Sequence, residues 1–426
     1  MRHDQSVTVA PAATTTQIDV RTVQRRSLGV LSGAQALVGL AVAGSIPAGA
    51  LIAEGVAGNE AAAGFAQTFG VTGAALAALP LARLTLAGGR RRALTAGVLT
   101  AALGAVLVVI GAAQRLLPAV YVGCLLVGVA SAAGYQARYG AADLAEPHRR
   151  GRALSIVVWA STVGAVLGPN LLEASGRLAV SYGLPQLAGP YVVAAVCLAL
   201  AGLVLQALRP DPYLLARTLA VASGDAVEGA RSTLREGVSH VRAHRGAQLG
   251  VAAVALGHAV MVMVMVMTPV HMRHVDVRLQ LIGLVISVHV AGMYALSPLV
   301  GWASDRLGRI PVIAVGVLIL ASACVLAAVV DADDVVGLGI ALFLLGLGWS
   351  CMLIAGSTLL VEDVDAADRP AVQGASDLVM NVAGALGGAV AGIVVAVSSY
   401  AVLCLVALVP VGILAALTVG AARRRR

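Results

Sequence analysis

The sequence predicts an all-α membrane protein in which twelve transmembrane helices form two six-helix bundles. The composition is the first reason: 59% of the 426 residues are hydrophobic and 12% are charged, with a mean hydropathy of +0.92, so most of the chain suits a lipid environment. The second is that apolar runs of about 20 residues, the length that crosses a bilayer core, recur along the chain. The third is an internal repeat that relates the two halves.

Charged or turn-forming breaks separate these runs and set approximate limits for each span. In the first half, the spans are expected at 28–53, 62–84, 94–114, 118–142, 153–174 and 188–208. In the second half, they are expected at 248–270, 280–303, 310–330, 335–361, 371–396 and 399–421. The resulting organisation is an N-terminal tail (1–27), a first bundle (28–208), a central loop (209–247), a second bundle (248–421) and a C-terminal tail (422–426).

The distribution of arginine predicts the orientation. Every basic residue other than histidine is an arginine, and all except Arg115, Arg177, Arg273 and Arg278 fall on one side of the predicted membrane. By the positive-inside rule, both termini are cytoplasmic and the protein lies in the cytoplasmic membrane. The net charge of +8 needs no nucleic-acid partner. The expected partners are the lipid bilayer and a transported small molecule, and the expected state is a monomer.

The repeat appears at three pairs of positions. Gly89 and Gly308 are separated by 219 residues, the difference between 308 and 89, and the same offset separates the two members of each remaining pair. Those pairs are Arg150 with Arg369 and Gly168 with Gly387. A constant offset across three segments predicts that the bundles are duplicated copies of one unit.

The loop after the eighth span carries the most specific motif. It runs from Gly301 to Arg309 and includes Asp305, Arg306 and Gly308. This arrangement resembles GxxxDRxGR, the signature loop of the major facilitator superfamily. The resemblance covers nearly the whole chain and implies that superfamily's fold, with the loop acting as a gate. A carboxylate beside a helix end can engage arginines and backbone amides of neighbouring helices.

The first-half copy of the loop departs from this pattern, since Leu86 stands where the aspartate belongs. A gate built on the motif is therefore expected to be asymmetric. In the fifth span, Gly164 to Pro169 resembles a glycine-proline motif of proton-coupled exporters in the superfamily. The alternative for this segment is close helix packing, which glycine permits.

Methionine and histidine are concentrated in one stretch. Its members are Met261, Met263, Met265, Met267, Met272, Met293, His258, His271, His274 and His289. Thioether and imidazole groups together favour Cu(I) over Mg²⁺, Ca²⁺ or Mn²⁺. Methionine is also a common filler of apolar helices, so packing is the alternative reading of the run.

Helical spacing selects a subset of these residues as metal ligands. Met261 and Met265 lie about 40° apart on one helix face, with His258 beside them, and His289 stacks above Met293 in the next span. An ionisable group such as His289 in the middle of an apolar span points to a function. Outside this set, His271, Met272 and His274 are expected on the outer side, where they would pass the ion inward.

The paired motifs resemble those of the CcoA-like copper importers of the superfamily. That resemblance implies uptake of copper, as Cu(I), with Met261, Met265, His289 and Met293 as the membrane binding motif. Copper would be the transported substrate, so no resident cofactor is expected. Other thiophilic ions such as Zn²⁺ remain open as the substrate.

Asp377 is an acidic residue inside a predicted span, and it shares a helix face with Asn381. It is a candidate proton carrier, and the alternative is a helix-end carboxylate paired with an arginine such as Arg369. The predicted function is secondary active import of copper by alternating access, without enzymatic chemistry. The alternative function is proton-coupled export of drugs or metabolites.

Overall fold

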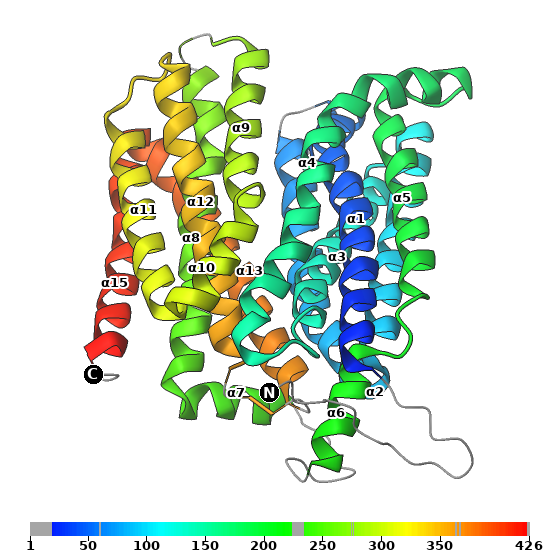
Figure 1. The fold of residues 1–426 in the computed structure, drawn as a ribbon. Helices are drawn as coiled ribbons and strands as arrows, with labels where there is room; N and C mark the ends of the chain where they lie inside the picture. Colours follow the sequence, from blue (N-terminus) through cyan, green and yellow to red (C-terminus); the bar gives the residue numbers. More distant parts are fainter. Residues whose placement is uncertain are drawn as a thin grey trace.

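The structure is a computed structural model that describes residues 19–58, 61–223, 234–273, 275, 277–362, 364–365 and 368–423. Within these residues all regular secondary structure is helical. The helices stand side by side in two groups, and α1 begins and α15 ends at the same end of the molecule (Figure 1). We call this end the terminal end.

The first group contains α1 (Val20–Ala57), α2 (Ala61–Ala113), α3 (Leu117–Gly140), α4 (Arg150–Ser181) and α5 (Gly189–Leu205). The second contains α8 (Arg245–Arg273), α9 (Leu279–Tyr294), α10 (Ser297–Leu307), α11 (Arg309–Val329), α12 (Val335–Leu360), α13 (Arg369–Val397), α14 (Tyr400–Val406) and α15 (Leu408–Arg423). In the sequence, two short helices, α6 (Pro212–Ala222) and α7 (Leu234–Ala243), separate the two groups. The 3-10 turns Pro147–Arg149 and Gln186–Ala188 flank α4.

These helices correspond to the twelve expected spans. Ten stretches of the described chain are long and apolar enough to cross a membrane. One of these stretches, 65–113, contains two spans that join at Gly89, and the 32-residue helix α4, which is not among the ten, supplies the remaining span. The α9–α10 and α14–α15 pairs each form one interrupted span. The twelve-helix architecture predicted from the sequence is therefore confirmed.

The repeat is visible in the backbone. Gly89 and Gly308 both have positive φ, 83° and 94°, and each lets one span turn directly into the next. Only glycine adopts this region readily. The two equivalent glycines therefore mark the same turn in each half of the chain.

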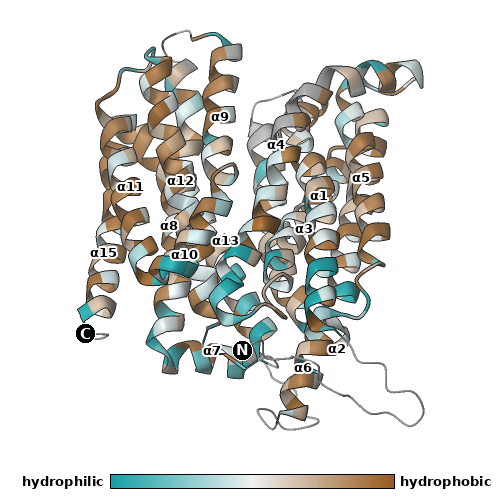
Figure 2. Cartoon of the chain, in the orientation of Figure 1, coloured by the Kyte–Doolittle hydropathy of each residue, from teal (hydrophilic) through white to brown (hydrophobic). Residues whose placement is uncertain are grey.

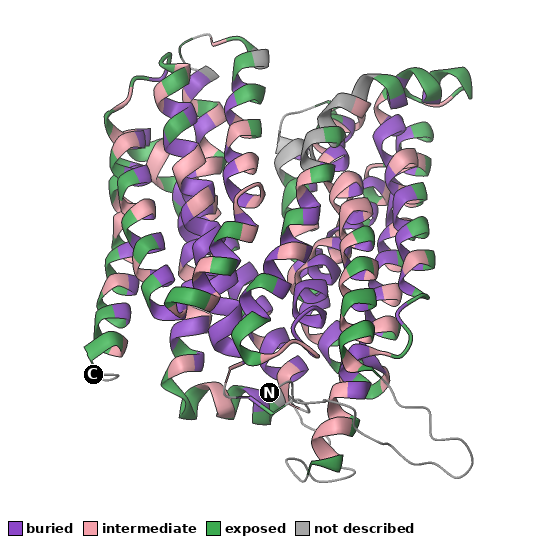
Figure 3. Cartoon of the chain, in the orientation of Figure 1, coloured by how far each residue is buried: buried purple, intermediate pink, exposed green. Residues whose placement is uncertain are grey.

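Each group of helices has its own apolar core. Buried side chains from residues 31 to 208 form one cluster, and a second cluster, centred on α12, is built almost entirely from residues 249 to 414. Buried residues face the inside of each group and the contact between the groups, whereas exposed ones face outward (Figure 3). The helices are predominantly hydrophobic, and hydrophilic residues gather toward the terminal end (Figure 2). The groups meet mainly through α2, α3 and α4 on one side and α9, α10 and α13 on the other.

The glycine-proline segment of α4 is a site of close packing. A Cβ atom on Gly164 would overlap the backbone of Gly39 and Leu40 in α1. Small residues allow helices to approach in this way in a membrane, where burial of apolar surface gives little drive for association. The structure therefore gives Gly164 a packing role, as the alternative reading of the motif expects.

The central segment contains a helix that the span prediction did not include. Asp211 caps α6, since its carboxylate accepts hydrogen bonds from the N–H groups of Tyr213 and Leu214. The other oxygen accepts from the N–H of Arg91, at 2.8 Å, and so ties the segment to the first bundle. The second helix of this segment, α7, begins at Leu234, and residues 224–233 before it lie outside the described residues.

Candidate functional site

The signature loop lies at the terminal end, where α10 passes into α11 through Gly308. Asp305 in the last turn of α10 reaches the other bundle. Its carboxylate accepts hydrogen bonds from the backbone N–H of Gly151 at 2.9 Å and of Arg152 at 2.8 Å. Both belong to the first turn of α4, where free N–H groups and the helix dipole favour negative charge. Asp305 therefore ties the second bundle to the first.

The arginines of the loop differ in their contacts. Arg309 lies 3.6 Å from the Asp305 carboxylate and donates a hydrogen bond to the carbonyl of Pro147 in the first bundle at 2.7 Å. Arg306 is exposed, with its guanidinium carbon 5.8 Å from the centre of the Trp302 ring. Arg309 thus strengthens the contact between bundles, and Arg306 lies on the surface of α10.

The first-half copy lacks the acceptor and one of the two donors of this helix cap. Leu86 occupies the position equivalent to Asp305, so the carboxylate is missing. Pro370 occupies the position equivalent to Gly151, and proline has no N–H to donate. The acceptor and one of its donors are therefore absent together, which makes the terminal end asymmetric in its chemistry.

An arginine provides the contact in the first-half copy. Arg90, the counterpart of Arg309, is buried and donates through Nε to Asp143 at 2.9 Å. Its Nη2 donates to the side-chain oxygen of Gln373 in α13 at 2.6 Å. Arg90 therefore joins the bundles through a neutral amide.

In a further pair of equivalent arginines, each arginine binds a helix end in the other bundle. Arg150 in the first turn of α4 donates to the carbonyl of Val361 at the end of α12, at 3.3 Å. Arg369 in the first turn of α13 donates to the carbonyl of Asp143, beyond the end of α3, at 3.4 Å. Positive charge suits the free carbonyls at a helix C-terminus. The repeat at Arg150 and Arg369 is thus also a repeat of contacts between the bundles.

Asp305→Asn is expected to open the terminal end. The substitution removes the charge that caps α4, worth about 1 to 2 kcal/mol, or roughly a five- to thirtyfold shift in population. The measurement is the rate at which maleimide labels a cysteine introduced at Ser155 of α4, which is buried against Gly301 of α10. The control is Asp334→Asn, because Asp334 caps its own helix α12 through the N–H of Gly337. Equal labelling rates in the two variants would contradict the role of Asp305.

A buried ion pair joins the bundles deeper in the molecule. Nη2 of Arg138 in α3 donates to Oδ1 of Asp377 in α13 at 2.8 Å, and both side chains are 2% exposed or less. The same nitrogen lies 3.1 Å from the hydroxyl of Tyr139. Asp377 therefore pairs with an arginine, as the alternative from the sequence expected, but this arginine is Arg138 of the opposite bundle and not the example named, Arg369. Arg369 instead binds backbone carbonyls.

Beside this pair is a small cavity with a volume of about 30 Å³. This volume holds about one water molecule. The lining residues come from both bundles: Gln35, Gly134, Tyr135, Arg138, Val157, Val158, Ser161, Tyr294, Trp349 and Leu353. Gln35 donates to Ser161 at 2.9 Å, and its side-chain oxygen has no hydrogen-bond partner among the described residues. The cavity therefore presents hydrogen-bonding groups and aromatic rings at the contact between the bundles.

The expected metal ligands of α8 lie in the core of the second bundle. Met261 is buried, Met265 is half-buried, and His258 is buried. His258 has a partner, since the indole N–H of Trp349 donates to its Nδ1 at 3.1 Å. This hydrogen bond leaves the imidazole proton on Nε2. His258 therefore serves to hold Trp349, a role that the methionine motif did not suggest.

The expected ligands of α9 are buried against α12. Nδ1 of His289 lies 2.8 Å from the carbonyl of Leu342, and Nε2 has no hydrogen-bond partner among the described residues. Met293 is buried one turn away, in the same apolar cluster as Met261. Helices α8 and α9 both pack along α12 and touch each other only marginally. The methionine pair of α8 and the His289–Met293 pair of α9 thus lie in the same bundle core, and α12 packs against both helices.

The residues expected to pass a metal inward are at the end of α8. Met272 is fully buried, and the ring of His271 stacks on Tyr400 with the ring centres 4.3 Å apart. His274 lies outside the described residues. Among the residues that the structure describes, no three His, Cys, Asp or Glu side chains are grouped to hold a metal ion.

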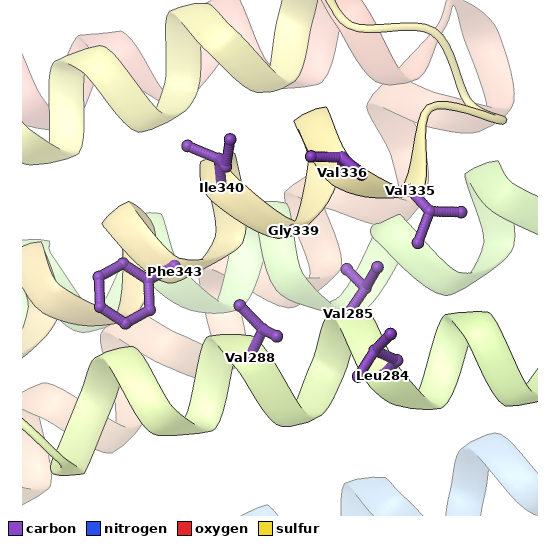
Figure 4. A pocket seen from close by; sticks show the side chains of 8 residues that line it. All are labelled: Leu284, Val285, Val288, Val335, Val336, Gly339, Ile340 and Phe343. Atoms are coloured by element: carbon purple, nitrogen blue, oxygen red, sulfur yellow. The ribbon is translucent and has the colours of Figure 1, made fainter.

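A larger cavity of about 330 Å³ lies between α9 and α12 (Figure 4). Its lining is entirely apolar and includes Leu284 and Val288 of α9 and Ile340 and Phe343 of α12. Leu284 and Ile340 are about half exposed. The cavity therefore offers no polar group to orient a solute.

Sequence reasoning missed the central site. Arg138, Tyr135 and Trp349 were not among the predicted functional residues, although an arginine inside a span is itself a signal of function. Arg138 sits close to the end of its span, where it resembles the other arginines of the terminal end. Its partner Asp377 is far away in the sequence, so no local motif links them.

Comparisons with known proteins identify the family. A family model of the Major Facilitator Superfamily matches residues 31–277 and 250–426, and the chain belongs to this superfamily. It is 39% identical to the uncharacterized MFS-type transporter YdeG of Bacillus subtilis, over 91% of this chain and 89% of that protein. It is 27% identical to the riboflavin transporter RfnT of Brucella anthropi, over 84% and 86% of the two chains.

Solved structures agree on the fold. The fucose transporter FucP in its outward conformation matches with a TM-score of 0.65 at 14% identity, over 92% of this chain and 97% of that one. The proton:xylose symporter XylE matches with a TM-score of 0.67 at 15% identity, over 93% and 95% of the two chains. The protein is therefore a multi-pass membrane transporter. These relatives give no support to the copper importer subfamily that the sequence motifs suggested.

Proposed function

We propose that this protein is a proton-coupled secondary transporter that binds a small organic solute between its two bundles and works by alternating access. It would lie in the cytoplasmic membrane with both termini in the cytoplasm, as the arginine distribution predicts. The observation that carries the proposal is the buried Arg138–Asp377 pair, which joins the bundles beside the central cavity.

The location of this pair supports coupling to protons. Asp377 is the only acidic group in contact with Arg138 among the described residues, and both are buried. Protonation of a carboxylate removes its attraction for an arginine, so it would loosen one contact between the bundles. A proton on Asp377 would thereby change the relative stability of the two access states.

The lining of the cavity supports an organic substrate. It combines aromatic rings with hydrogen-bonding side chains, as binding sites for small organic molecules do. Its volume of about 30 Å³ holds one water molecule, so an organic solute would bind when the bundles move apart and widen the cavity. The relative named as a riboflavin transporter is consistent with this class of solute. The proposal assigns no direction of transport.

The test is uptake by the purified protein in proteoliposomes with a pH gradient of one unit. The solutes are riboflavin and a panel of aromatic and aliphatic organic acids, detected by mass spectrometry. We expect at least one solute to accumulate up to about tenfold, the driving force of one pH unit for one coupled proton. Accumulation that persists after an ionophore collapses the gradient would contradict proton coupling.

Copper import is the second candidate, and His289 is the observation that favours it. A carbonyl only accepts hydrogen bonds, so the contact with Leu342 leaves the proton of His289 on Nδ1 and the lone pair on Nε2. Histidine ligands of metals commonly use this arrangement. Met293 would add a soft sulfur one turn away, and Met261 and Met265 would complete the set from α8.

His289→Ala and Met265→Leu are expected to weaken Cu(I) binding by at least about tenfold, since each removes a ligand. The measurement is competition for Cu(I) with the chelator bicinchoninate. The control is Met263→Leu, because Met263 packs toward Gly387 of α13. If the wild-type protein binds no Cu(I) in this assay, the copper candidate is rejected, and the organic-solute proposal is unaffected.

A further inference from the structure

The central arginine has unused hydrogen-bonding capacity. Arg138 uses Nη2 for Asp377 and Tyr139, while its buried Nε and Nη1 atoms have no partner among the described residues. The Oδ2 atom of Asp377 is also buried without a partner. A guanidinium and a carboxylate can form two parallel hydrogen bonds, but this pair forms one. Buried polar groups in proteins are nearly always satisfied, so the spare donors point to a second acidic group that binds there.

Aromatic side chains surround this arginine. Aromatic residues make up only 3% of the chain. The guanidinium carbon of Arg138 nevertheless lies 5.3 Å from the ring centre of Tyr135 and 4.6 Å from that of Tyr139. Across the cavity, Tyr294 and Trp349 meet edge to face with their centres 5.9 Å apart. Fixed ring faces of this kind favour a planar aromatic ligand.

The Trp349 ring is held in place. Its N–H donates to His258, which fixes the rotation of the indole beside the cavity. On the other wall, Gln35 contributes a side-chain oxygen without a partner among the described residues. The cavity thus combines a cation, an aromatic wall and a hydrogen-bond acceptor.

Charge balance then links the substrate to the proton. Arginine stays protonated in proteins, so the buried guanidinium needs one negative charge beside it. Building on the proposed function, we infer that the central site takes a planar aromatic monoanion, such as a carboxylate, together with one proton. The proton adds to the Asp377 carboxylate, and the anion of the substrate takes its place on Arg138. The net charge of the site is the same before and after binding, and no other bond forms or breaks.

The neighbours of Asp377 define which groups can take part. The charged or titratable side chains that interact with it are Arg138, Tyr135 and Tyr139 from α3 and Arg90 from α2. His258 of α8 lies against Gly384, two turns further along α13. Asp377 is the only carboxylate of this set, so its replacement separates the proton from the anion.

The test is isothermal titration calorimetry of the purified full-length protein in two buffers with different ionisation enthalpies. The probes are 2-naphthoate, its neutral amide 2-naphthamide, and the saturated, non-planar decahydronaphthalene-2-carboxylate. We expect naphthoate to bind at least about tenfold more tightly than either analogue. The comparison of buffers should show uptake of about one proton per naphthoate bound.

Three variants complete the experiment. Asp377→Asn should bind naphthoate without proton uptake, and Arg138→Met should not distinguish naphthoate from naphthamide. Arg92→Met, an exposed arginine of the terminal end, should behave as the wild type. Three results for the wild-type protein would overturn the inference: binding of the amide as tightly as the acid, no measurable naphthoate binding, or naphthoate binding without proton uptake. Proton-driven uptake of a neutral solute would still leave the proposed function standing.

Discussion

Arg138→Met is expected to abolish transport and to lower the free energy of unfolding by about 3 to 5 kcal/mol. The reason is that Asp377 would remain as a buried, unpaired charge between the bundles. The measurements are solute uptake in proteoliposomes and chemical denaturation in detergent. Methionine approximates the length of the arginine stem, so the charge is the main loss.

The double variant Arg138→Met with Asp377→Leu is the informative control. Removal of both charges should recover most of the stability, since no unpaired charge remains, while transport stays absent. If the single variant is as stable as the wild type, Asp377 is not held as a buried carboxylate by Arg138. If the double variant transports normally, the pair has no role in the transport cycle.

Asp377→Asn is expected to separate exchange from accumulation. The amide keeps the shape of the carboxylate but cannot bind or release a proton, so the protein should still exchange solute across the membrane. A pH gradient of one unit should then drive no accumulation, where the wild type reaches up to about tenfold. The measurements are counterflow and gradient-driven uptake in the same vesicles.

A control for this variant is Asp143→Asn, which alters the other buried carboxylate between the helix ends. Asp143 pairs with Arg90 within the first bundle and lies away from the central cavity. We expect the Asp143→Asn variant to accumulate solute in response to the pH gradient as the wild type does, and only the rate of uptake to change. Gradient-driven accumulation in Asp377→Asn would show that another group carries the proton.

The fold was predictable because its signals are local. Apolar runs, arginine-rich breaks and the loop around Asp305 each lie within a short stretch of sequence. The loss of the cap in the first half could also be read from Leu86. The loss of a donor at Pro370 could not be predicted in this way, because its meaning depends on the contact that Gly151 makes with Asp305 in the structure.

The central site was not predictable in the same way. Its polar groups come one or two at a time from five helices, and the charged partners Arg138 and Asp377 belong to different bundles. The methionine run, by contrast, is conspicuous in the sequence, but its members divide between the faces of α8. Met263 packs toward α13, and His258 binds Trp349. Local concentration of a residue type therefore drew attention to packing positions as well as to candidate ligands.

The most direct test of the central claim needs no substrate. Spin labels are attached to cysteines at Ala207 and Ala422, which are exposed at the terminal ends of the first and second bundles. The five native cysteines are buried. The distance between the two labels, measured by double electron–electron resonance at low and high pH, reports the opening of the terminal end. If Asp377 is the proton-sensitive junction with Arg138, acidification widens the distance in the wild type, and Asp377→Asn is wide at every pH. A pH response that persists unchanged in Asp377→Asn would contradict the account.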